Sequence, residues 1–136
     1  MESCVRQTTK GDLAFQEDGV KFHLLNPRKI KCQKIQVDGC LPIFGPKCDW
    51  FVSADNASIL IELKGGDIDK AVVQLQATIL WLKKKEALQA SDRKCYIVTS
   101  NRCPKLNTKL MFLKEKFVKE YGAVLIIRRS GAIEAI

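Results

Sequence analysis

The sequence predicts an α/β domain in which a mixed central sheet of about five to six strands is flanked by helices. Two observations lead to this fold class. Strand-like runs joined by short turns fill the first half of the chain, and two amphipathic helical segments alternate with strands in the second half. The length of 136 residues, 46% of them hydrophobic, suits one core, so residues 1–136 are expected to form a single domain.

The first half of the chain is expected to supply the antiparallel strands. Residues 13–16 are interpreted as one helical turn, and residues 18–19, an Asp-Gly pair, as a tight turn. Residues 20–25 and 30–37 have the composition of strands, and an irregular alternation in the second run predicts a bulge. Residues 41–47 contain two prolines and a glycine, which predicts a loop because continuous strand pairing is excluded.

A hairpin is predicted around residues 55–56, an Asp-Asn pair that separates two apolar runs. Strand side chains alternate between faces, so Glu62 and Lys64 share one face of the second run while their apolar neighbours share the other. Folding back of the hairpin is expected to bring Asp49 beside Glu62.

The second half is expected to alternate helices with parallel strands. Residues 67–89 and 108–121 have helical periodicity, the second ending at Gly122, and residues 94–99 and 123–127 have the composition of strands. Strands connected through helices run parallel, whereas the early strands joined by turns run antiparallel. The residues expected to face the sheet are Ile68, Val72, Leu75, Ile79 and Leu82 in the first helix and Leu110, Leu113, Phe117 and Val118 in the second.

The candidate site combines two carboxylates with a lysine. Asp49 and Glu62 offer the oxygen ligands that Mg²⁺ prefers, and Lys64 is a cation that can orient an attacking water, a set suited to metal-dependent hydrolysis of a phosphodiester. Gln74 lies off the apolar stripe near the helix start, where its amide can reach a phosphate or a base edge. The alternatives are a structural ion pair between Glu62 and Lys64, and a solvated surface glutamine.

The order of these residues resembles the core of the PD-(D/E)XK nuclease superfamily, which includes many restriction endonucleases and archaeal Holliday-junction resolvases. In that family an Asp opens one strand, Glu-x-Lys lies on the next, and a helix carrying Gln-Leu follows. Asp49, Glu62, Lys64 and Gln74 match these positions. The family proline that often immediately precedes the first acid is here Pro46, three residues before Asp49.

The resemblance implies a cofactor, a substrate and an oligomeric state. It implies Mg²⁺, replaceable by Mn²⁺, held by Asp49, Glu62 and the main-chain carbonyl of Leu63, with DNA as substrate and a homodimer as the active form. Two further carboxylates are left open as members of the site. They are Asp38, and Glu17, because the resolvase branch places an acid near its N-terminus.

Positive charge is concentrated in the C-terminal part of the chain. Residues 83–129 contain thirteen basic and four acidic residues, whereas residues 1–82 contain ten of each, within a net charge of +8. Such a field attracts polyanions, although a run of lysines is also typical of a solvated helix face. The residues expected to hold a nucleic-acid backbone are Lys83, Lys84, Lys85, Arg102 and Lys105.

The cysteines and the single histidine are expected to be structural. Cys32, Cys40 and Cys48 recur at eight-residue steps, but the chain has no C-x-x-C pair, which favours small buried residues over a zinc site. His23 is interpreted as a strand residue. The polar N-terminus lacks a secretory signal and no apolar run approaches a membrane span, so a cytoplasmic protein with reduced cysteines and no membrane partner is expected.

The leading hypothesis is a Mg²⁺-dependent endonuclease that hydrolyses DNA phosphodiester bonds, structure-selective in the manner of a junction resolvase, with RNA as a further candidate substrate. One alternative is a nuclease-fold module without turnover that binds nucleic acid or a protein. Another is an interaction protein whose basic surface meets an acidic partner. Metal binding that Asp49→Ala abolishes would separate the first from the second, and salt-sensitive DNA affinity would exclude the third.

Overall fold

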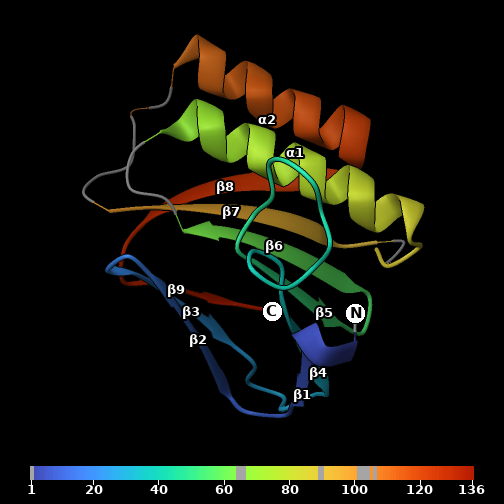
Figure 1. Ribbon diagram of the computed structural model, residues 1–136. Helices are drawn as coiled ribbons and strands as arrows, with labels where there is room; N and C mark the ends of the chain where they lie inside the picture. The colour runs from blue at the N-terminus through green and yellow to red at the C-terminus, as the bar shows by residue number, and fades with distance from the viewer. Residues whose placement is uncertain (1, 64–66, 89–90, 101–104, 106) are drawn as a thin grey trace.

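The computed structural model describes residues 2–63, 67–88, 91–100, 105 and 107–136. Their helices and strands form three layers, in which a six-stranded mixed sheet lies between a pair of helices and a smaller sheet of three strands (Figure 1). The predicted α/β class and mixed central sheet are therefore confirmed.

Six strands form the central sheet. They are, in spatial order, β1 (Val5–Thr8), β4 (Cys32–Gln36), β5 (Trp50–Ala54), β6 (Ala57–Leu63), β7 (Arg93–Thr99) and β8 (Ala123–Arg129). The first four pair antiparallel, whereas β6, β7 and β8 are parallel neighbours. The change of direction falls at β6 because the connections that follow it pass through helices.

The two helices are α1 (Ile68–Lys84), between β6 and β7, and α2 (Thr108–Tyr121), between β7 and β8. The bounds of α2 are those predicted, and Gly122 ends it in the left-handed conformation with a φ of 59°. The α1 helix begins one residue after its Asp67 cap, but it ends earlier than predicted, shortly before Glu86 adopts a φ of 55°. No helix among the described residues is long and apolar enough to cross a membrane.

Both helices lie on the same face of the central sheet, so the prediction of helices flanking the sheet is wrong for its other face (Figure 1). That face is covered by β2 (Asp12–Glu17), β3 (Val20–Leu25) and β9 (Ala132–Ala135), in the order β2-β3-β9. Here β2 and β3 form an antiparallel hairpin, and β3 pairs with the distant β9 in parallel.

Residues 13–16 belong to β2 and not to the helical turn that was predicted. Leu13 and Phe15 are buried while their neighbours are exposed, which is the two-residue period of a strand. Asp18 and Gly19, with φ values of 48° and 79°, make the two-residue turn that returns the chain into β3.

Each face of the central sheet has its own hydrophobic core. One core joins the sheet to the helices and contains Leu110 and Phe117, whereas Val118 is 56% exposed, so its predicted inward position is wrong. The second core fills the space between the two sheets. Cys32 faces this second core and Ile35 faces the first, so the two apolar residues lie on opposite faces of β4 and the apolar pattern of 30–37 looks irregular. The predicted bulge is wrong, because β4 pairs continuously with β5.

The five cysteines that the structure describes divide into two groups. Cys4 and Cys40 form a disulfide, so the expectation that all cysteines are reduced is wrong for this pair. Cys32, Cys48 and Cys95 are free and buried, as expected of small core residues. Because Cys40 is bonded to Cys4, the three cysteines at eight-residue steps do not form a zinc site.

Candidate active site

Two carboxylates face each other at the open end of the β5–β6 hairpin. Trp50 and Ile61 are the last antiparallel partners of the two strands, and Asp49 and Glu62 are the residues that come next on each side. The N–H of Asp49 donates to the carbonyl of Ile61 over 3.2 Å, one residue out of the register of the ladder, and its carboxyl is hydrogen-bonded with that of Glu62. The hairpin therefore brings Asp49 beside Glu62, as the sequence predicted.

Hydrogen bonds fix the Asp49 carboxylate and its main chain from both sides. Its Oδ2 accepts the N–H of Leu63 over 2.8 Å, which ties the side chain to the end of β6. Its carbonyl accepts the N–H of Val37 over 3.0 Å, which ties the main chain to the segment that follows β4. The carboxylate is thus held in place by the sheet, and its position does not depend on a mobile side chain.

The surroundings of Asp49 favour its protonated form. Burial raises the pKa of Asp49 to about 6, and the negative charges of Glu17 and Asp38 act in the same direction. The hydrogen bonds from the Leu63 N–H and with the Glu62 carboxyl act against this rise in pKa. Glu62 itself is only 1% exposed. Two carboxyl groups in contact at such a place share a proton more readily than they both ionise.

The α1 helix supports the pair from the opposite side. Thr78 Oγ1 accepts the N–H of Cys48, the residue before Asp49, over 2.8 Å, and donates to the carbonyl of Gln74 over the same distance. Gln74 therefore lies one helical turn closer to the start of α1 than Thr78, on the side of the helix that meets the segment containing Cys48.

The Gln74 side chain is half-buried, which argues against the solvated surface glutamine considered above. Its Oε1 is buried and has no hydrogen-bond partner among the described residues. A buried amide oxygen without a partner costs about 1–3 kcal/mol, so a ligand that donates a hydrogen bond, or a metal-bound water, would stabilise it.

Two further carboxylates influence the site. Glu17 ends β2 and Asp38 follows β4, and both are close enough for their charges to raise the pKa of Asp49. The sequence left both residues open, and the structure places both in this neighbourhood. A stronger signal for Glu17 was the Asp-Gly pair after it, which is typical of a hairpin turn and implies that the preceding residues form a strand.

The oxygen atoms of the Asp49 and Glu62 carboxyl groups are ligands of the kind that a hard divalent cation prefers. Asp49 and Glu62 supply carboxylate oxygens, and a bound cation can replace the proton that the raised pKa of Asp49 favours. Within residues 2–63, 67–88, 91–100, 105 and 107–136, no three His, Cys, Asp or Glu side chains gather closely enough to hold a metal ion by themselves. The coordination shell would therefore need the Leu63 carbonyl and water, which is usual for Mg²⁺.

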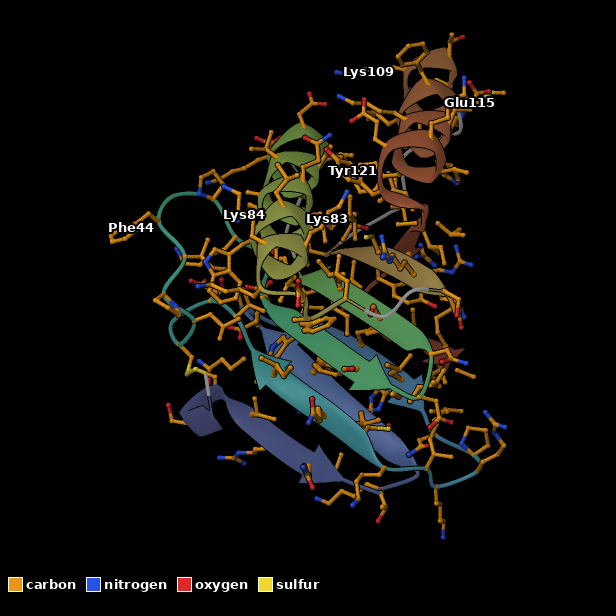
Figure 2. All side chains as sticks on the ribbon, turned by 90° about the vertical axis from the view of Figure 1, so that its right-hand side faces the viewer. Phe44, Lys83, Lys84, Lys109, Glu115 and Tyr121 are labelled. Atoms are coloured by element: carbon orange, nitrogen blue, oxygen red, sulfur yellow. A yellow bond between two sulfur atoms is a disulfide. The ribbon has the colours of Figure 1, made fainter. Side chains whose placement is uncertain are left out.

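The structure does not bring every predicted site residue to this pair. Lys64 and Arg102 lie outside the described residues, and Lys105 is exposed. Lys83 and Lys84 are exposed in the last turn of α1 (Figure 2), and the exposed Lys85 is its C-cap. The ten residues from Gln74 to the end of the helix span about 15 Å along its axis, so this lysine run is separated from the carboxylates.

Comparisons with known proteins add no assignment to this geometry. No protein-family model, no curated protein and no solved structure matches the chain. The functional interpretation therefore depends on the residues and contacts described above.

Proposed function

We propose that this protein is a metal-dependent endonuclease that hydrolyses the phosphodiester bonds of DNA, with a core similar to that of the PD-(D/E)XK nucleases. The observation that carries the proposal is the contact between Asp49 and the buried Glu62. Burial of two adjacent carboxyl groups weakens a fold, because ionised groups lose hydration and repel each other. Such a pair is typical of a site that binds a cation.

The order of the elements supports the same proposal. Asp49 immediately precedes β5, Glu62 lies in β6, and α1 follows with Gln74 on the side that meets the strand leading to Asp49. This order of acid, second acid and helix glutamine supports a core similar to the one that the resemblance implied. The antiparallel hairpin leads into two parallel strands through α1 and α2, as the sequence predicted.

The residues of the chain have separate roles in this proposal. Asp49 and Glu62 would hold Mg²⁺ or Mn²⁺ together with the Leu63 carbonyl, and the chemistry that such an ion supplies is polarisation of the phosphate and activation of a water. Lys64, as the resemblance implies, would orient the attacking water. Gln74 would offer its amide to the phosphate or to the water.

A thermal-shift titration with Mg²⁺ or Mn²⁺ tests the cation site without reference to turnover. We expect either ion to stabilise the wild type, and Glu62→Gln to abolish the effect because it removes one charged ligand at nearly constant volume. Glu115→Gln is the matched control, since Glu115 is exposed on α2, away from the hairpin (Figure 2). Equal metal-dependent shifts in wild type and Glu62→Gln would refute the site.

A cleavage assay tests the reaction. End-labelled duplex, branched and single-stranded DNA, with RNA of the same sequence, would be incubated with Mg²⁺ or Mn²⁺. We expect cleavage of DNA by the wild type and by Glu115→Gln, and a loss in Glu62→Gln at least as large as the ~10²-fold effect of one lost electrostatic contact to the transition state. Metal binding without cleavage of any substrate would favour the inert module instead.

The homodimer remains a prediction that follows from the proposed function, since a duplex offers two strands to two sites. Light scattering of the protein with and without DNA tests it. A monomer under both conditions would contradict this part of the proposal.

A further inference from the structure

A second cluster of charged side chains lies at the edge where the two sheets meet. A groove of about 310 Å³ opens there between β1 and β2. Three cations line it: Arg6 comes from β1, Lys10 from the connection to β2, and Lys34 from β4. Asp12 is the sole carboxylate among the described residues that line the groove, and its Oδ1 already lies 3.0 Å from Nδ1 of His23.

Lys34 is built into the floor of this groove. Its Nζ donates to the carbonyl of Ala14 over 2.8 Å and lies 4.5 Å from the ring centre of Phe15 and 4.8 Å from that of Trp50. Burial lowers the pKa of Lys34, and the charges of Arg6 and Lys10 lower it further. An ammonium has three donors, so the bond to Ala14 leaves others for a ligand.

A purely structural role explains Lys34 but not its neighbours. The Ala14 carbonyl and the two aromatic rings account for a lysine that joins the two sheets. Arg6 and Lys10 add two like charges to the same groove and weaken the protonated form of Lys34. None of these three cations takes part in the salt bridges found within the described part of the chain. Three cations that gather around a single carboxylate, itself engaged with His23, are typical of a site for an anion.

We propose that the groove between β1 and β2 binds the phosphodiester backbone of a nucleic-acid strand. Arginine matches the oxygens of a phosphate with two parallel donors, and lysine contributes a point charge to it. Backbone contacts of this kind position a strand without reading its sequence. The proposal rests on the proposed function for the identity of the ligand as a nucleic acid, whereas the groove and its charges do not depend on it.

The location of the groove fits a strand that continues to the carboxylate pair. Lys34 precedes Val37 by three residues, and the N–H of Val37 donates to the carbonyl of Asp49. Three residues of extended chain span roughly 10 Å. Lys34 lies on the face of the central sheet that meets the small sheet, and Glu62 lies on the face that meets the helices, so a strand held at Lys34 would reach the pair around the end of the sheet where Asp49 lies.

Two variants with equal loss of charge test the groove. Arg6→Gln combined with Lys10→Gln removes one arginine and one lysine that line it, and both side chains are exposed, so the fold should be kept. Lys21→Gln combined with Arg129→Gln removes the same charge from exposed positions that do not line the groove. Circular dichroism and urea unfolding confirm that both proteins are folded before binding is compared.

Binding of a labelled single-stranded oligonucleotide, measured by anisotropy in EDTA over a range of salt concentrations, gives the decisive comparison. Each lost phosphate contact flattens the slope of log K against log salt by about 0.7, so the groove variant should lose about 1.4 in slope and roughly 10- to 25-fold in affinity at about 0.1 M salt. The control variant should keep the wild-type slope. Equal losses in both variants, or a loss in neither, would overturn the proposal.

Two further arms separate the ligand source and the catalytic site. Inorganic phosphate, followed through the indole resonance of Trp50, should bind the wild type and not the groove variant, and should compete with the oligonucleotide. Phosphate binding with unchanged oligonucleotide affinity would refute the nucleic-acid assignment. The oligonucleotide is bound in EDTA, without divalent ions, so the two sites are tested separately. If only the groove hypothesis is wrong, the metal-dependent thermal shift is still seen. If only the carboxylate site is wrong, the groove variant still loses affinity for the oligonucleotide.

Discussion

Asp49→Asn should stabilise the protein at neutral pH in the absence of metal and remove part of its pH dependence. Burial raises the pKa of Asp49 from its ordinary value of 3.8 to about 6. A folded-state pKa above the unfolded value means that the folded protein binds the proton more tightly, so ionisation weakens the fold. The protonated carboxyl of Asp49 therefore contributes stability that is fully present below about pH 4 and is lost as the pH rises through about 6.

The expected size follows from the shift. Two pKa units correspond to about 3 kcal/mol, and because Asp49 is half-buried, screening by solvent reduces this to about 1–2 kcal/mol. Asparagine keeps an oxygen for the N–H of Leu63 and offers its amide to the Glu62 carboxylate, so the local bonds are preserved. The free energy of unfolding of Asp49→Asn should therefore exceed that of the wild type by this amount above about pH 6 and approach it near about pH 4.

Urea denaturation in EDTA at a series of pH values measures the difference. The control is Asp55→Asn, which removes the same charge from the exposed turn at the other end of the hairpin, where asparagine tolerates the φ of 48°. The reasoning would be refuted if Asp49→Asn were less stable than the wild type at neutral pH, or if its free energy of unfolding depended on pH as strongly as that of the wild type. Added Mg²⁺ should reverse the order, since saturation at 100 times the Kd stabilises only a protein that binds it, by about 2.7 kcal/mol.

Three further predictions concern a support of the site, the helix-side core and the basic surface of α1. Thr78→Val should destabilise the fold by about 1–3 kcal/mol because the buried N–H of Cys48 loses its acceptor, whereas Thr78→Ser should be close to wild type in urea denaturation. Phe117→Ala should cost about 3–5 kcal/mol because Phe117 is fully buried, whereas Phe112→Ala, on the same helix but 69% exposed, should change the unfolding midpoint little. Reversing the charge of residues 83–85 should weaken DNA binding to the same extent for all sequences and flatten its salt dependence, while the Mg²⁺-dependent thermal shift is retained. An unchanged salt slope would mean that these lysines are only a solvated helix face.

Local patterns predicted the elements that are organised by local signals. The α2 helix has an Asn cap and a left-handed glycine at its two ends, and its bounds follow directly from them. The central hairpin is equally local, because residues 55–56 separate two runs that pair with each other. These features depend on neighbours in the chain, which a single sequence shows.

The second sheet depends on contacts between distant segments and was not predicted. In β9, intermediate and exposed residues alternate, and the strand pairs with β3 more than a hundred residues earlier, so no local apolar pattern identifies it. Residues 12–17 do alternate, but the segment is short and contains an alanine, which also suits a helix. The sequence therefore indicated the helices that cover one face of the central sheet, but it did not indicate the three-stranded sheet that covers the other face.

Strand periodicity allowed the Asp49 and Glu62 part of the candidate site to be predicted from the sequence. The parts of the site that depend on packing between distant segments could not be predicted. Asp49 and Glu62 meet because they follow the last paired residues of the hairpin, Trp50 and Ile61, whereas the influence of Glu17 requires the small sheet to pack beside the hairpin. Gln74 and Thr78 stand four residues apart on one side of α1, and the second holds the main chain next to Asp49. The same side of the helix thus positions the first acid and presents the amide, so a change at Thr78 should displace both together.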